Sequence, residues 1–147
     1  MRRVREGTRH RLLLDTHGWM WFAAGERSKL SRRVTSRLER ARQAGALYVS
    51  PVSALEIARL VAKGRLRLGA DVLAWVEAAL DRSGVLLAGL TPAIAVQAGS
   101  LSTVGGDPAD WILIATAQAL GAMLVTRDAA ILGYGGAGHV RVVDAGA

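Results

Sequence analysis

The sequence predicts an α/β fold in which a central, mainly parallel sheet is flanked by helices. Short apolar runs of strand length alternate with longer helical patterns along the whole chain, which is typical of parallel strands joined by crossover helices. Three of the expected helices open on a capping residue followed by proline, at Ser50-Pro51, Thr91-Pro92 and Asp107-Pro108. Proline suits the first helical position because its missing N–H is not needed there.

The first half of the chain is expected to supply two buried strands and four helices. Residues 11–15 form the first strand, because Leu12, Leu13 and Leu14 make the continuous apolar run of a strand covered on both faces. A short aromatic helix follows directly. The remaining expected elements are a polar, arginine-rich helix to about residue 44, a strand over 46–49, a helix over 50–62, a turn over 64–69 and an amphipathic helix over 71–82.

The second half is organised around residues 106–128. A strand over 85–90 and a helix over 91–101 are expected before this unit. The helix that begins at Asp107 is apolar almost all round, so it should be buried on more than one side. Gly121 ends it, and residues 122–126 form a buried strand. A glycine-rich loop over 131–138 and a last strand over 139–143 complete the predicted fold.

Composition limits the class of protein and favours a polyanionic partner. The 147 residues, 51% of them hydrophobic, suffice for one domain with a full core. We expect this single domain over residues 11–147, after a basic, flexible arm over residues 1–10. All but two of the 19 basic residues are arginine, and the net charge is +7, which suits RNA or DNA, although a GC-rich coding sequence explains the arginines equally well. The sequence shows no membrane span, signal peptide or cysteine, so we expect a cytoplasmic protein.

Four acidic residues fall at comparable places in this pattern. Asp15 and Asp128 each end a strand, whereas Glu56 and Asp110 lie near the starts of helices. Strand ends and adjoining helix starts share one edge of a parallel sheet, so all four carboxylates are expected to converge there. Each acid also has a purely structural interpretation as a helix or turn cap. Four acids at equivalent points of the topology favour a functional site.

Converging carboxylates need a counter-charge. Two carboxylates about 4 Å apart repel by roughly 4 kcal/mol at an effective dielectric of about 20. A proton or a cation between them relieves this repulsion, and oxygen-only ligands select a hard ion such as Mg²⁺ or Mn²⁺. Such an ion orients and polarises a phosphate and lowers the pKa of an attacking water. The four acids therefore predict metal-dependent hydrolysis of phosphodiester bonds.

Four motifs in this order resemble those of the PIN-domain nucleases, and more narrowly those of the VapC-type toxins of toxin–antitoxin pairs. The motifs are LLLDTH at 12–17, SPVSALEIARLVAKGRL at 50–66, DPADWILIATA at 107–117 and LVTRD at 124–128. The resemblance covers nearly the whole chain from residue 11 onward. It implies a three-layer α/β/α fold, usually dimeric, and Mg²⁺- or Mn²⁺-dependent cleavage of RNA. It also implies a small antitoxin that occupies the site.

The resemblance assigns roles to individual residues. Its acidic quartet, catalytic and metal-binding, falls on Asp15, Glu56, Asp110 and Asp128. Three residues are expected to support the site, namely Thr126, Asp107 and Ser53. Thr126 matches a small hydroxyl residue that often precedes the last acid, and for Asp107 we favour helix capping over metal binding. Relatives commonly carry a His near Gly105 and an Arg where this chain has Trp111, which leaves the roles of those basic residues open.

The sequence predicts two protein partners, an antitoxin and a second copy of this chain. An antitoxin would place a basic side chain among the acids, because the donors of an arginine can bridge two carboxylates. The rest of the antitoxin would lie in an apolar groove, lined by Trp19, Trp21, Phe22, Ile57 and Leu60. The hydrophobic composition favours a homodimer, through the helices expected over 71–82 and 91–101.

Other interpretations fit less well. Residues 133–138 match G-x-G-x-x-G, but they precede a strand instead of opening a helix after one, so no dinucleotide site is expected. The histidines are too scattered to predict zinc, although His17 is close enough to Asp15 in sequence to contact a substrate. Aspartyl-phosphate phosphatases need a second Asp where His17 stands, and receiver domains need a late lysine that is absent. The main rival is a PIN fold without turnover that binds RNA or a protein.

Overall fold

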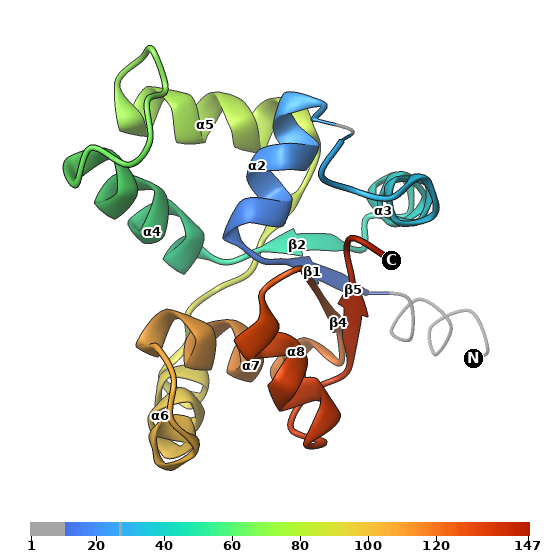
Figure 1. Ribbon diagram of the computed structural model, residues 1–147, viewed down its shortest axis with the longest axis vertical. Helices are drawn as coiled ribbons and strands as arrows, with labels where there is room; N and C mark the ends of the chain where they lie inside the picture. The colour runs from blue at the N-terminus through green and yellow to red at the C-terminus, as the bar shows by residue number, and fades with distance from the viewer. Residues whose placement is uncertain (1–10, 27) are drawn as a thin grey trace.

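The computed structural model describes residues 11–26 and 28–147, and its centre is a five-stranded sheet (Figure 1). The strands are β1 (Leu12–Leu14), β2 (Leu47–Val49), β3 (Leu86–Leu87), β4 (Met123–Thr126) and β5 (Val142–Asp144). Their order in space is β3-β2-β1-β4-β5, and every adjacent pair is parallel. The predicted α/β class is confirmed. The arm predicted for residues 1–10 lies outside the described residues.

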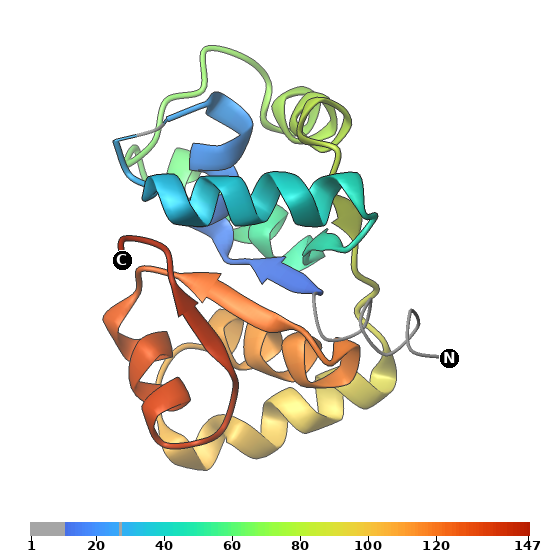
Figure 2. The ribbon, with the colours of Figure 1, turned by 90° about the vertical axis from the view of Figure 1, so that its right-hand side faces the viewer.

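Helices cover both faces of the sheet and complete three layers (Figures 1 and 2). One face carries α2 (Thr16–Ala24), α3 (Arg32–Gln43), α4 (Pro51–Ala62) and α5 (Val72–Ser83). The other carries α6 (Pro92–Ser100), the short 3₁₀ helix η1 (Leu101–Val104), α7 (Pro108–Leu120) and α8 (Ala129–Gly136). Within the described ranges, no helix combines the length and the hydrophobicity that crossing a bilayer requires.

Strand β1 contributes to both layers of the core. Its three leucines are at most 1% exposed. Leu12 and Leu14 pack into the cluster that includes residues of α2, α3 and α5, whereas Leu13 packs into the cluster that includes residues of α7. Successive side chains of a strand point to opposite faces, so a run of three leucines fills both layers. Strand β1 lies between β2 and β4, and its carboxyl end is therefore central in the sheet.

Helix α7 is buried on several sides, as predicted. Residues 113–117 are each at most 1% exposed. Asp107 caps the helix, because its carboxylate accepts the Ala109 N–H at 3.0 Å, and Pro108 occupies the first turn. Gly121 ends the helix in the left-handed conformation, with φ of 62°. The capping role favoured for Asp107 is confirmed.

The C-terminal segment differs most from the prediction. Residues 129–136 form helix α8 instead of a glycine-rich loop. Asp128 caps this helix by accepting the Ile131 N–H at 3.1 Å, and Ile131 is 2% exposed. Gly135 allows the helix to approach β5, since a Cβ there would lie 2.5 Å from Cγ2 of Val142. Burial and close packing outweigh the roughly 1 kcal/mol that a glycine costs inside a helix.

Candidate active site

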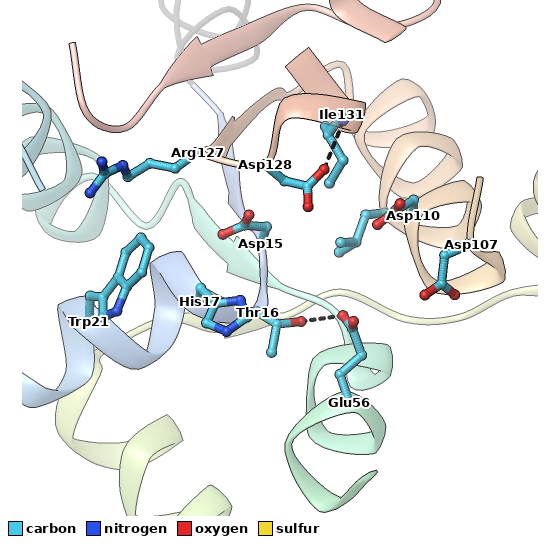
Figure 3. Close-up of a pocket in the computed structure, with 11 residues that line it drawn as sticks. Asp15, Thr16, His17, Trp21, Glu56, Asp107, Asp110, Arg127, Asp128 and Ile131 are labelled. Carbon is cyan, nitrogen blue, oxygen red and sulfur yellow. Dashed lines mark hydrogen bonds between the residues drawn. The ribbon is translucent and has the colours of Figure 1, made fainter. Parts of the chain in front are cut away.

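A pocket of about 390 Å³ opens at the carboxyl edge of the sheet, where β1 and β4 end (Figure 3). Its lining comprises Asp15, Thr16, His17, Trp21, Glu56, Asp107, Asp110, Leu113, Arg127, Asp128 and Ile131. All four acids of the predicted quartet line this one pocket, and Asp107 joins them. They come from four different segments, namely the end of β1, helix α4, the start of α7 and the end of β4. The structure therefore brings together the residues that the topology predicted to converge.

Asp15 is the most firmly held of these acids. It is 6% exposed, and each carboxylate oxygen accepts a hydrogen bond, one from the Gly18 N–H at 2.7 Å and one from the Thr126 hydroxyl at 2.5 Å. The first bond is the N-cap of α2, so the same side chain caps a helix and lines the pocket. A Cβ at Gly18 would lie 2.8 Å from the Asp15 oxygen, which requires glycine here. Burial raises the pKa of Asp15, and these two hydrogen bonds oppose the rise.

Thr126 links Asp15 to Asp128. Its buried hydroxyl donates to Asp15 and accepts the Asp128 backbone N–H at 2.9 Å. A hydroxyl can do both at once, which explains why a small hydroxyl residue serves at this position. Asp128 is itself exposed; one carboxylate oxygen caps α8, and Figure 3 shows the other directed into the pocket.

Glu56 is held from the α2 side of the pocket. The Thr16 hydroxyl donates to the Glu56 carboxylate and lies 3.0 Å from the hydroxyl of Ser53, which is fully buried. Burial raises the pKa of Glu56, and the bond from Thr16 opposes this rise. The purely structural interpretation of Glu56 as a helix cap is wrong, because Ser50 caps α4 through the Val52 N–H at 3.1 Å.

Thr16 was missed by the sequence reasoning. The signal available was its position immediately after Asp15, at the carboxyl end of a buried strand. A polar residue there starts the next helix and points along the sheet edge, where the other site residues gather. Thr16 is 4% exposed and touches both the acid and the supporting serine of α4. It belongs with Thr126 as a residue that holds an acid in place.

Asp110 is the acid that the fold compensates least. It is half-buried in the first turn of α7. Burial and then the negative charges of Asp128, Asp107, Glu56 and Asp15 raise the pKa of Asp110 to about 7, and among the described residues no hydrogen bond opposes this rise. The carboxylates of the pocket therefore repel one another, and a positive charge placed among them would be strongly favoured.

The donor set suits a hard divalent cation. The candidate ligands are carboxylate oxygens, which Mg²⁺ and Mn²⁺ prefer. In the part of the chain that the structure describes, no three acidic or histidine side chains lie close enough to form a ready-made ligand cage. Mg²⁺ does not need one, because it keeps several waters and is often held by one or two carboxylates and the phosphates of a substrate. The pocket thus fits a partly hydrated ion.

One wall of the pocket is aromatic and basic. The rings of His17 and Trp21 lie 5.7 Å apart, and the Arg127 guanidinium carbon lies 5.8 Å from the centre of the Trp21 ring. Arg127 also donates to the Lys29 carbonyl at 3.2 Å, and Figure 3 shows it turned away from Asp15 toward Trp21. Arg127 was also missed, although it immediately precedes the last acid of the quartet.

The two departures noted in the sequence lie in the loop before α7, near Gly105, and in the first part of α7, at Trp111. The indole N–H of Trp111 donates to the Gly105 carbonyl at 2.8 Å, and the Tyr134 hydroxyl donates to the same carbonyl. Trp111 and Tyr134 therefore hold this loop against α7 and α8.

The predicted apolar partner groove is only partly at the surface. Trp19 is 1% exposed and packs edge-on against Trp75, and Ile57 is fully buried. Placing Trp19 and Ile57 in a docking groove is therefore wrong, because a buried side chain offers no surface to a partner. The other three residues, Trp21, Phe22 and Leu60, are half-buried and keep some exposed surface.

Comparisons with known proteins agree with this fold. The chain matches the PIN domain family model over residues 12–136. It is 36% identical over 118 residues to Ribonuclease VapC22 of Mycobacterium tuberculosis, a match that covers 80% of this chain and 86% of that protein. It also superposes, with a TM-score of 0.64 and 14% identity, on a chain in the crystal structure of VapBC2 from Rickettsia felis bound to a promoter DNA fragment. That match covers 90% of this chain and 96% of the other, and it shows a shared fold.

Proposed function

The chain belongs to the PIN-domain family, and we propose that it is a metal-dependent endoribonuclease, the toxin of a toxin–antitoxin pair, acting in the cytoplasm. The observation that carries this proposal is the convergence of four carboxylates in one pocket at the carboxyl edge of the sheet. The 36% identity to a named ribonuclease supports RNA as the substrate, and the net charge of +7 supports a polyanionic one.

In this proposal Asp15, Glu56, Asp110 and Asp128 hold Mg²⁺ or Mn²⁺. When bound, the ion supplies polarisation of the scissile phosphate and activation of a water. Thr126 and Thr16 keep two of the acids oriented through the hydrogen bonds described above. The pKa of Asp110 is raised to about 7, so this carboxyl would hold a proton part of the time near neutral pH and would give it up to bind a cation.

The substitution Asp15→Asn tests the proposal. Asparagine preserves the N-cap, because its side chain also accepts a backbone N–H, but it removes a charged ligand. We expect the wild type to cleave single-stranded RNA with Mg²⁺ or Mn²⁺ and the variant to have lost cleavage. Asp71→Asn is the matched control: Asp71 is an exposed N-cap that accepts the Ala74 N–H at 3.1 Å, away from the pocket. Cleavage that survives in Asp15→Asn would refute the metal-nuclease assignment, and an inactive wild type would favour the rival binding module.

A protein antitoxin is the partner that the pocket supports. The repulsion that raises the pKa of Asp110 makes the metal-free pocket attractive to an arginine side chain. The half-buried Trp21 beside it offers apolar contact to the rest of the partner. If a basic side chain occupies the pocket, Mg²⁺ must compete with it, so partner affinity should fall as Mg²⁺ is added. The partner to test is the product of a short gene adjacent to this one. If its affinity for this chain did not change with Mg²⁺ concentration, the docking model would be contradicted.

A homodimer through one edge of the molecule is also proposed. Exposed apolar side chains gather on α5, β3 and α6 and the loop between them, namely Leu73, Leu86, Leu87, Leu90 and Val96. Figure 2 shows α5 and β3 at one edge, with the start of α6 below them. A monomer rarely keeps so many large apolar groups on one side exposed to water. Light scattering at micromolar concentration should give twice the chain mass, and a monomeric mass would contradict the proposal.

A further inference from the structure

A second hollow continues from the acid pocket along helix α4. It has a volume of about 240 Å³. Its lining comprises Thr16, His17, Glu56, Arg59, Leu60, Lys63, Arg65 and Asp107. Four of these residues, Thr16, His17, Glu56 and Asp107, also line the acid pocket. The two hollows therefore lie side by side and share part of their lining, so a chain-like ligand can extend from one to the other.

The end of this hollow farther from the acids is basic. Arg59, Lys63 and Arg65, which we call the basic shelf, are all exposed. Arg59 and Lys63 lie three and seven residues after Glu56, and this spacing places Glu56, Arg59 and Lys63 along one side of α4. With a rise of 1.5 Å per residue, Lys63 lies roughly 10 Å along the helix axis from Glu56. The charge of the surface thus changes sign within about two helical turns.

The described residues form no salt bridge with the basic shelf. Residues 11–26 and 28–147 contain one salt bridge, between Arg42 and Glu39 at 2.8 Å, and neither residue belongs to the shelf. Arg59 lies in the last turn of α4 and Lys63 caps its end, where basic side chains favourably meet the helix dipole. Arg65 lies beyond the helix and has no such role. Three cations that form no salt bridge with the described residues line one hollow, and an anionic ligand accounts for this arrangement.

We propose that the basic shelf binds backbone phosphates of the RNA strand on one side of the scissile phosphate. This inference rests on the proposed function and names the path that the substrate takes to the site. Five carboxylates in the acid pocket repel a polyanion, so substrate binding requires positive charge close by. The shelf supplies that charge in a hollow that shares four lining residues with the pocket. Its two arginines can each hold a phosphate through two hydrogen bonds.

The test measures RNA binding as a function of salt in the Asp15→Asn background, so that cleavage does not interfere. One variant also carries Arg59→Gln, Lys63→Gln and Arg65→Gln. The matched control carries Arg32→Gln, Arg33→Gln and Arg40→Gln, which remove the same charge from exposed positions on α3 that line neither hollow. For single-stranded RNA, each lost phosphate contact lowers the slope of log K against log salt by about 0.7.

In the shelf variant we expect the magnitude of this slope to fall by up to about 2 and RNA binding to weaken. In the control variant the magnitude of the slope should fall by less than about 0.7. With Asp15 intact, the shelf variant should raise KM and leave kcat nearly unchanged, because the contact is made equally before and during the reaction. Equal slopes in the two variants would overturn the proposal. So would a lower melting temperature of the shelf variant with an unchanged slope, since that pattern indicates a structural role at the end of α4.

The outcome also separates this inference from the proposed function. A wild type that cleaves RNA, combined with equal slopes in the two variants, refutes the shelf and leaves the nuclease standing. A wild type that does not cleave, combined with a reduced slope in the shelf variant alone, refutes the nuclease and supports the shelf as an RNA contact.

Discussion

The Asp15 side and the Asp110 side of the acid pocket compensate their carboxylates in different ways. Asp15 is 6% exposed, and both its oxygens accept hydrogen bonds from the protein, from Gly18 and Thr126. Asp110 is half-buried, no hydrogen bond within the described part of the chain opposes the effect of its burial, and its pKa rises to about 7. One side of the pocket is therefore positioned before anything binds, whereas the other depends on a proton or a cation from solution.

Under the proposed function, this difference predicts separate roles for the two sides in binding an ion. A ligand whose orientation is fixed by hydrogen bonds sets where an ion sits, since supporting partners orient a metal ligand and tune its basicity. A ligand under repulsion supplies the electrostatic drive for binding, because repulsion between carboxylates is relieved when a cation arrives. The four predictions below test this division, from the largest expected effect to the smallest.

Thr126→Val should have the largest effect, because Asp15 loses a buried donor. We expect cleavage to fall by roughly 10- to 100-fold, as for other partners of metal ligands. The unfolding free energy should fall by roughly 1–3 kcal/mol, because an acceptor is left unsatisfied in the interior. Steady-state cleavage of RNA and urea unfolding measure the two effects. Thr116→Val is the control, since that buried hydroxyl donates to the Ile112 carbonyl at 2.6 Å within α7 and does not line the pocket. Equal activity of the two variants would contradict the role of Thr126.

Binding of Mg²⁺ or Mn²⁺ should stabilise the fold by relieving the repulsion around Asp110. At a free concentration a hundredfold above its dissociation constant, the ion adds about 2.7 kcal/mol to the unfolding free energy. Thermal melts with the metal and with a chelator measure this shift. A variant carrying Glu56→Gln, Asp110→Asn and Asp128→Asn should show almost none of it. An equal shift in that variant would mean that the ion binds elsewhere.

The metal-free protein should lose stability as pH rises through the acidic range to neutrality. The pKa of Asp110 is raised from 3.8 to about 7 by folding, so between these values the folded state binds more protons than the unfolded state, and stability falls with rising pH. Above about pH 7 this contribution levels off. The raised pKa values of Asp15 and Glu56 act in the same direction. Asp110→Asn should flatten the profile measured by urea unfolding in a chelator, and an unchanged profile would show that Asp110 is not the repelled acid.

The acids of the site were predictable because their signals are local. A buried apolar run followed by an acid, or an acid in the first helical turns, places a carboxylate at the carboxyl edge of a parallel sheet wherever the rest of the chain goes. Asp15 and Asp128 show that capping and site formation were not competing explanations. Each caps the helix after its strand and lines the pocket as well.

What could not be predicted depends on contacts between distant segments. Trp19 and Trp21 are two residues apart on α2, which rotates them roughly 200° around the helix axis, so one is core and the other lines the pocket. The aromatic residues of α2 are apolar on every side of the helix, and nothing in the local sequence indicates which side packs against the rest of the protein. Likewise the glycines of α8 suggest a loop until Val142 is seen packed against Gly135. The strand predicted over 85–90 is reduced to β3, at the exposed edge of the sheet.

Arg127→Gln should have the smallest effect, although Arg127 stands in sequence between Thr126 and Asp128 and so between the two sides of the pocket. Its guanidinium lies over Trp21 and donates to the Lys29 carbonyl, and its charge is not among the causes that shift the pKa of Asp15 or Asp110. We therefore expect a loss of about 0.5–1 kcal/mol from the exposed cation–π contact and no change in the metal-free pH profile.

Urea unfolding of the Arg127 variant in a chelator, at about pH 6 and about pH 8, measures both quantities, with Arg127→Lys as the variant that keeps the charge. A profile that becomes steeper only in Arg127→Gln would mean that this cation screens the acids. The distinction between the Asp15 side and the Asp110 side would then be wrong, because Arg127 would already supply the positive charge that the Asp110 side is expected to take from solution.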